Sequence, residues 1–186
     1  IPDIAGMPHE FIVPRQLRNA YERSMTLAGG KLIIVGDNEE TRSQHIEAAI
    51  GPNTAGIFYV APGNSPSVLP IEEVIRLGHA HNIPIVVDAA GQVYPTDNLS
   101  KYAKMGTDLV AYGGKYFGGF NSSGLLVGKK EMVEAAKLHN FMGSDAMPGF
   151  MPFGRAMKLD RQEIVGTYVA LREWLTMNHE DRLLGY

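Results

Sequence analysis

Residues 83–92 read Ile-Pro-Ile-Val-Val-Asp-Ala-Ala-Gly-Gln, an apolar run that ends at an acid followed by small residues. The run over 83–87 has the β-branched composition and the length of a buried strand. Apolar residues at helical spacing flank it, over 71–82 and 99–105, so the strand lies between two helices along the chain. This arrangement is typical of a parallel sheet that helices cover on both faces.

The same alternation of strands and helices continues in both directions from this stretch. Further strands are predicted over 31–35, 57–60, 108–112 and 125–127. Further helices are predicted over 14–28, 41–50 and 129–139, with a last helix from residue 160. The predicted fold class is therefore α/β, with a mostly parallel sheet flanked by helices.

Two segments near the end of the chain differ in character. Residues 140–154 are rich in Gly, Pro and Met without any period, which predicts a functional loop. Asp160 and Glu163 have the spacing of a capping box at the start of the last helix. We expect four apolar residues to form its buried stripe: Ile164, Tyr168, Leu171 and Leu175.

Composition excludes several classes of protein. The 186 residues are 45% hydrophobic and 20% charged, the balance of a globular domain. Seventeen basic against 20 acidic residues give a net charge of −3, which argues against nucleic acid as a partner. The absence of cysteine excludes thiolate zinc sites and disulfide scaffolds, and it fits a cytoplasmic protein. No apolar run approaches the roughly 20 residues that cross a bilayer, so no membrane partner is expected.

Two ionisable residues follow neighbouring predicted strands. Asp88 ends the strand over 83–87, and Lys115 follows the strand over 108–112. Ligands bind at the carboxyl ends of parallel strands, and successive strands are usually neighbours, so both residues are expected to face one pocket. A partly desolvated acid needs a partner such as a protonated pyridine nitrogen, and a lysine amine attacks an aldehyde. The pair favours pyridoxal 5′-phosphate (PLP), bound to Lys115 as a Schiff base, with Asp88 keeping the ring nitrogen protonated.

Small residues surround both of these positions. Gly113 and Gly114 allow the backbone to approach a flat ring or a phosphate, and Ala90 is small enough to pack beneath the ring. Taken singly, Asp88 could be only a helix cap and Lys115 only a solvated loop lysine. Their combination is the more specific pattern.

A phosphate-binding loop is the main rival explanation for the glycines. That signature requires Gly six residues before the lysine and Ser or Thr directly after it. Leu109 and Tyr116 occupy these positions here, and the dinucleotide G-x-G-x-x-G pattern is absent as well. Nucleotide binding is therefore disfavoured.

These motifs resemble those of fold-type I PLP enzymes, specifically the selenocysteine synthase and D-glucosaminate-6-phosphate ammonia-lyase group. The resemblance runs through Val87 to Gln92, Asn98-Leu99, and Gly106 to Val110 leading to Gly113-Gly114-Lys115. It also includes Pro2-Asp3, Gly6-Met7, residues 123–130 and residues 154–161. It implies a fold-type I large domain over residues 1–186, incomplete at both ends.

The resemblance also implies roles for individual residues. Lys115 matches the Schiff-base lysine, Asp88 the pyridine partner, and Gln92 a residue close to the cofactor. Arg155 and Lys158 match a basic pair that receives an anionic group of the substrate, although ordinary salt bridging would also explain them. His9 is a further candidate for the pocket wall, where a structural histidine is the alternative. No metal is expected.

The chemistry implied is α,β-elimination on a hydroxy amino acid or an amino sugar acid, giving a 2-keto acid and ammonia, with Lys115 as general base. Aldol cleavage, racemisation and selenium transfer to seryl-tRNA are the alternatives within the cofactor class, and tRNA is disfavoured because no basic patch is visible. A catalytically inert fragment with a structural role is the alternative from another class. A homodimer or larger homo-oligomer is implied, with Phe120 and Asn121 facing a neighbour.

Overall fold

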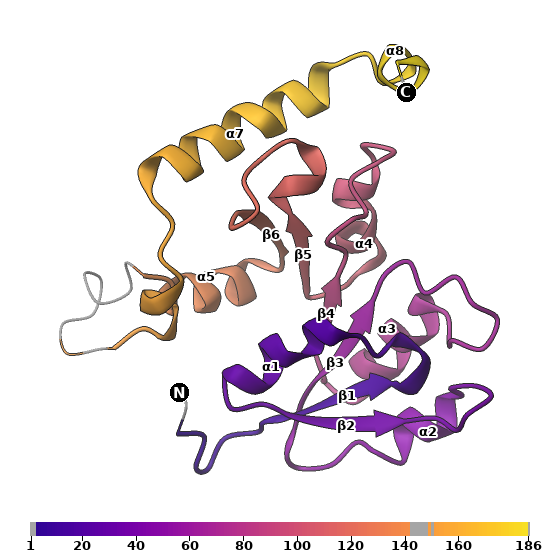
Figure 1. Ribbon diagram of the computed structural model, residues 1–186. Coiled ribbons are helices and arrows are strands. Elements are labelled where there is room, and N and C mark those ends of the chain that lie inside the picture. The colour runs from indigo at the N-terminus through magenta and orange to yellow at the C-terminus, as the bar shows by residue number, and fades with distance from the viewer. Residues whose placement is uncertain (1–2, 142–148, 150, 186) are drawn as a thin grey trace.

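A six-stranded sheet forms the centre of the molecule, in the order β2-β1-β3-β4-β5-β6 (Figure 1). The computed structural model describes residues 3–141, 149 and 151–185. Strands β1 to β5 are parallel, and β6 is antiparallel to β5. The strands are β1 (Glu10–Pro14), β2 (Lys31–Val35), β3 (Thr54–Val60), β4 (Ile85–Asp88), β5 (Leu109–Gly113) and β6 (Gly124–Gly128). The predicted α/β class is confirmed.

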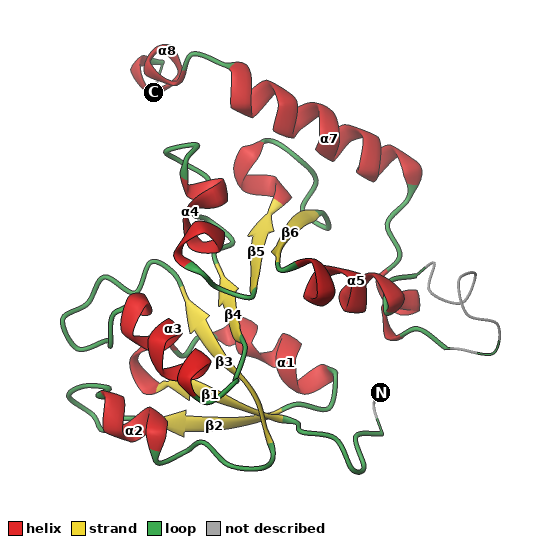
Figure 2. Ribbon diagram, turned by 180° about the vertical axis from the view of Figure 1, so that it is seen from behind, coloured by secondary structure: helices red, strands yellow, loops and turns green. Residues whose placement is uncertain are grey.

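Helices lie on both faces of this sheet, with α1 on one face and α2 and α3 on the other (Figures 1 and 2). The helices are α1 (Arg23–Leu27), α2 (Ser43–Glu47), α3 (Ile71–Ala80), α4 (Asn98–Met105), α5 (Lys130–Leu138), α7 (Arg161–Thr176) and α8 (His179–Leu184). Short 3-10 helices are η1 (Arg15–Leu17), η2 (Ala20–Glu22), η3 (Gly114–Phe117) and η4 (Phe153–Met157). Within the described ranges, no helix has both the length and the apolar character that crossing a bilayer requires.

The core lies between the sheet and its helices. Ile57, Ile85 and Val110 come from three neighbouring strands and are completely buried. On α3, Val74 and Leu77 are buried against them, because apolar residues three apart lie on one face of a helix. This packing fixes the strands whose carboxyl ends carry the motif residues.

The long helix predicted over 14–28 is wrong. The segment contains η1, η2 and α1, because Arg18 and Asn19 are extended and interrupt it. Asn19 begins a new turn by accepting a hydrogen bond from the Tyr21 N–H at 2.8 Å. The preceding strand β1 is not predicted, because its short apolar run ends at Pro14, the first residue of the predicted helix.

The buried stripe predicted for the last helix is also wrong. Ile164, Tyr168 and Leu175 are 48%, 65% and 54% exposed, and Leu171 is half-buried. The buried residues of α7 are Thr167 and Trp174. Both polar groups are satisfied there: the Thr167 hydroxyl donates to the Glu163 carbonyl and the Trp174 indole to the Val93 carbonyl. The prediction of a helix is correct, but choosing its buried face by hydrophobicity alone selected the face that is exposed to solvent.

Two further expectations concern the segment before α7. The capping box is confirmed, since the Asp160 carboxylate accepts from the Glu163 N–H at 2.7 Å and the Glu163 carboxylate accepts from the Asp160 N–H at 2.8 Å. Of the loop predicted over 140–154, residues 142–148 and 150 lie outside the described residues. The last two residues of the predicted loop belong to η4.

Candidate active site

Asp88 is the last residue of β4, where the sheet ends. It pairs in register with Val60 of β3 and with Ala111 of β5. The half-buried carboxylate accepts one hydrogen bond, from the Ala90 N–H to Oδ1 at 3.0 Å. Oδ2 has no hydrogen-bond partner among the described residues, so this oxygen is available to a ligand.

The loop after β4 is hydrogen-bonded to the end of β5. The Ala89 N–H donates to the Ala111 carbonyl at 3.0 Å, and the Gly113 N–H donates to the Ala90 carbonyl at 3.0 Å. A turn follows, in which the Gln92 N–H donates to the Ala89 carbonyl at 2.8 Å. The structure therefore brings the loop of Asp88, Ala90 and Gln92 together with the end of β5, at one edge of the sheet.

Lys115 lies in η3, a tight turn directly after β5. The Gly114 N–H donates to the Ser123 carbonyl at 2.8 Å, and a Cβ on Gly114 would stand 2.9 Å from that oxygen and overlap the Ser123 hydroxyl. Gly118 ends the turn in the left-handed region at φ +87°, which favours glycine. Phe117 is buried and anchors the turn, which leaves the Lys115 side chain exposed.

Tyr116 is a residue of this site that sequence reasoning missed. A Cβ on Gly91 would lie 3.7 Å from the Tyr116 ring, and one on Gly113 would lie 3.0 Å from it. The ring therefore packs on glycines from both loops, and the Lys115 ammonium lies 5.0 Å from its centroid. An aromatic residue directly after the lysine was the one available signal. Gly113, which was predicted to let a flat ligand approach the backbone, also makes room for this ring.

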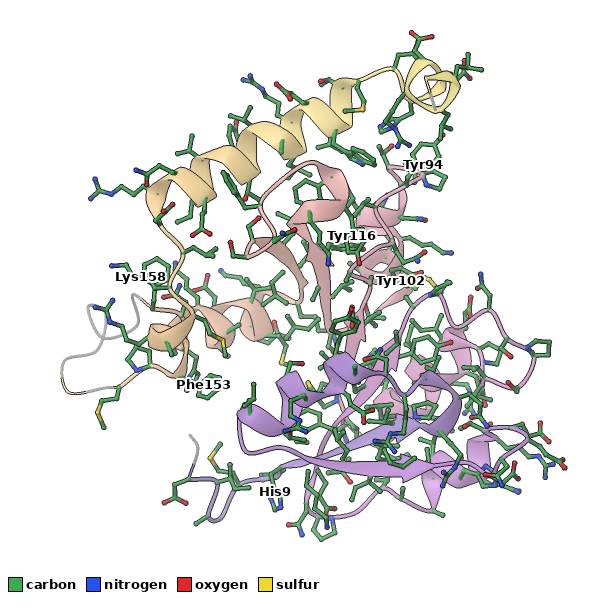
Figure 3. All side chains as sticks on the ribbon, viewed as in Figure 1. His9, Tyr94, Tyr102, Tyr116, Phe153 and Lys158 are labelled. Carbon is green, nitrogen blue, oxygen red and sulfur yellow. The ribbon has the colours of Figure 1, made fainter. Side chains whose placement is uncertain are left out.

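The structure does not bring the three predicted substrate residues to this edge of the sheet. Lys158 follows η4, with its ammonium 5.9 Å from the centroid of the Phe141 ring, and Arg155 is exposed within η4. His9 precedes β1, and its Nδ1 lies 2.9 Å from the Met7 carbonyl oxygen. Figure 3 shows Lys158 and His9 well apart from Tyr116 and from each other. Their roles stay predictions.

A cluster of charges occupies the opposite end of β5. The buried Asp108 carboxylate accepts from the Ile85 N–H at 2.7 Å and pairs with Lys129 at 2.6 Å and His79 at 3.1 Å. Burial alone would raise the pKa of Asp108, but the hydrogen bonds from Lys129, Ile85 and His79 outweigh burial and hold its pKa below the ordinary value. Because this cluster joins α3 and β4 to the residues directly before β5 and α5, away from Lys115, its role is structural. No group of three metal-ligating side chains gathers anywhere in the described ranges.

A comparison with known families agrees with this geometry. The family model described as SelA, L-seryl-tRNA selenium transferase, matches residues 22–183. The chain belongs to this family. The selenium transferase family and its enzyme relatives are PLP-dependent, which fits a lysine and an acid at the ends of adjacent strands.

Curated relatives of this family carry several activities. The chain is 26% identical to a 5′-C-glycyluridine monooxygenase-decarboxylase from Streptomyces sp, over 98% of this chain and 44% of the relative. It is 27% identical to the D-glucosaminate-6-phosphate ammonia lyase of Salmonella typhimurium, over 94% and 45%. It is 26% identical to the L-seryl-tRNA(Sec) selenium transferase of Aquifex aeolicus, over 84% and 35%. The chain therefore spans less than half the length of these relatives.

Solved structures show the same fold. A D-glucosaminate-6-phosphate ammonia-lyase superimposes with a TM-score of 0.82 at 26% identity, over 96% of this chain and 46% of that protein. A cysteine desulfurase from Escherichia coli superimposes with a TM-score of 0.63 at 18% identity, over 92% and 47%. The second match shows the fold alone.

Proposed function

We propose that residues 1–186 form the large PLP-binding domain of an ammonia-lyase-like enzyme. The proposed reaction is α,β-elimination on a hydroxy amino acid or an amino sugar acid, giving a 2-keto acid and ammonia. One observation carries the proposal: Asp88 ends β4 and Lys115 follows β5, two paired strands, and backbone hydrogen bonds join the loop after β4 to the end of β5. Similarity to the ammonia lyase supports elimination over aldol cleavage or racemisation.

The residues at this edge fit the cofactor. PLP, when bound, withdraws electrons from the bond being broken at the substrate Cα. The available Oδ2 of Asp88 would accept a hydrogen bond from the ring nitrogen and favour its protonated form. Ala90 presents little side-chain bulk, so a flat ring could approach the loop after β4 there, while the Tyr116 ring covers Gly91 and Gly113. The exposed amine of Lys115 would bind the cofactor covalently; once the substrate amine displaces it, the freed amine would take the proton from the substrate Cα.

Covalent attachment of PLP to Lys115 tests this proposal first. Purified chain is mixed with PLP, reduced with borohydride, and digested for peptide mass spectrometry. We expect the label on Lys115, its loss in Lys115→Ala, and normal labelling in Lys104→Ala, which removes an exposed lysine of α4. Asp88→Asn should still label but should bind PLP about tenfold or more weakly, because a charged hydrogen bond is lost.

The reaction itself needs a second experiment on the full-length protein. Phosphorylated and plain β-hydroxy amino acids and amino sugar acids are screened for release of ammonia and keto acid. Aldehyde release or loss of chirality without ammonia would replace elimination by aldol cleavage or racemisation. A chain that folds but never labels Lys115 would point to the inert structural role.

We propose that the substrate is anionic and that Arg155, Lys158 and His9 contribute to its binding. Arg155 and Lys158 are both exposed cations on one segment. Arg155→Gln in the full-length enzyme should raise KM for a phosphorylated substrate while kcat stays near wild type. An equal change for the plain substrate would remove the anion-binding role. Arg172→Gln on α7 is the matched control.

A homodimer or larger homo-oligomer is part of the same proposal. Phe120, 47% exposed, and the exposed Asn121 follow the Lys115 turn and are the residues expected to face a neighbour. Light scattering should give a multiple of the 20.3 kDa chain mass. A strictly monomeric protein that forms keto acid would contradict this part.

A further inference from the structure

Helix α7 contacts the loop that follows Lys115. The Phe120 ring packs on Gly166. A Cβ added to Gly166 would lie 3.3 Å from the Phe120 ring atom Cδ2 and closer still to the adjacent ring atom Cε2. The Ser122 hydroxyl donates to the Glu163 carboxylate. The first half of α7 is thereby attached to the segment between η3 and β6 (Figure 1).

The last turn of α7 contacts the loop that follows Asp88. The indole N–H of Trp174 donates to the Val93 carbonyl at 2.9 Å, across 81 residues of sequence, and both side chains are buried. Val93 is the residue directly after Gln92. A single rigid helix therefore reaches both loops of the candidate site.

Helix α8 reinforces this contact through Arg182. Its guanidinium carbon lies 4.7 Å from the Trp174 ring centroid and 5.1 Å from that of Tyr94, so the cation lies against two aromatic rings. Such cation–π contacts favour one arrangement of the three side chains. Tyr94 follows Val93, so two successive residues of the loop are held from the same side.

His179 completes the cluster in one protonation state. The Arg182 Nε–H donates to His179 Nδ1 at 3.1 Å, so Nδ1 must be the acceptor. His179 Nε2 lies 2.8 Å from the Trp174 carbonyl, which can only accept, so Nε2 carries the hydrogen. The neutral Nε2–H tautomer satisfies both bonds and ties α8 to the end of α7.

We infer that α7 and α8 brace the loop after β4, and that Trp174 and Arg182 are positioning residues for Gln92. Gln92 lies between two anchors: its own N–H is bonded to the Ala89 carbonyl, and the next residue is bonded to Trp174. Its side-chain amide makes no hydrogen bond to the described residues, so the hydrogen bonds that hold this part of the loop run through the backbone. The link to the cofactor rests on the proposed function, while the brace itself does not.

Hydrogen exchange on the cofactor-free chain tests the brace directly. Trp174→Phe keeps a ring and removes the N–H that Val93 needs. We expect amide exchange in the peptide over 89–97 to rise on the order of fivefold, the effect of losing one hydrogen bond, with no change in β3. Tyr168→Phe, on the exposed side of α7, is the matched control and should behave as wild type.

A second variant keeps the test decisive if Trp174→Phe fails to fold. Arg182→Gln removes the cation from the two rings, and Arg172→Gln on the exposed face of α7 is its control. Faster exchange over 89–97 in Arg182→Gln supports the brace. Unchanged exchange in a folded Trp174→Phe or Arg182→Gln variant overturns it.

A double-mutant cycle tests the role toward the cofactor. Trp174→Phe should weaken PLP binding several-fold, and should have little further effect in a Gln92→Ala background, because both changes act through one contact. Independent effects that multiply would overturn the positioning role and leave Trp174 as a stabilising residue only. If the wild-type chain binds no PLP, the proposed function fails, and the exchange experiment still decides the brace.

Discussion

Gly114 occupies a position that a side chain cannot share with Ser123. Gly114→Ala should destabilise the protein by about 1–3 kcal/mol, because the added methyl group meets the Ser123 hydroxyl and carbonyl. Urea unfolding followed by circular dichroism measures the loss. Gly51→Ala is the control, since nothing lies within 4 Å of that added methyl. Equal midpoints for the two variants would show that the η3 turn can move aside.

Also at the residue scale, the sequence allows the prediction of residue positions that depend only on the order of the strands in the sheet. Asp88 ends β4 and Lys115 follows β5, and consecutive strands are neighbours in most parallel sheets. Tyr116 was beyond such reasoning, because its contact with Gly91 depends on a side-chain direction that no local pattern encodes. Lys158 was assigned by resemblance. A resemblance suggests the role of a residue, but it does not show where the side chain lies in the folded chain.

At the scale of elements, the Asp108 carboxylate links α3, β4 and the residues that directly precede β5 and α5. Its pKa is held below the ordinary value of 3.8, so the folded state releases this proton more readily than the unfolded state. This contribution to stability is present above that value and is lost as pH falls through the lower folded pKa.

Asp108→Asn should therefore cost about 1–3 kcal/mol at neutral pH and flatten the loss of stability in acid. Chemical unfolding at neutral pH and at a series of acidic values provides the measurement. Asp97→Asn, an exposed residue whose side chain caps nothing, should leave both properties unchanged. An unaltered acid profile in Asp108→Asn would place the pH dependence in other groups.

Elements with a clear period were predicted best. Helix α3 and strand β2 follow their patterns because burial is decided locally by one apolar face or run. The buried face of α7 was not predicted, because Trp174 is buried against Val93, which lies 81 residues away in the sequence. The new turn that begins η2 likewise involves one hydrogen bond, which the Asn19 side chain accepts from the Tyr21 N–H and which periodicity does not register.

At the scale of the whole molecule, charge bears on the choice between substrates. The net charge of −3 provides no general attraction for a polyanion. We expect filter binding at physiological salt to give a Kd for tRNA weaker than about 10⁻⁴ M, the weak end of non-specific binding. Tight, salt-dependent retention by this chain would instead favour selenium transfer to seryl-tRNA, the activity named by the family.

The hydrogen bond from the Trp174 indole to the Val93 carbonyl also determines when the loop after β4 is held in place during synthesis. A ribosome adding about 5–20 residues per second makes Trp174 roughly 4–16 s after Val93, since 81 residues separate them. Throughout that interval the sheet can assemble while the segment after β4 has no partner on this side. In a nascent chain the loop after β4 should therefore be held from this side only once α7 and α8 have left the exit tunnel.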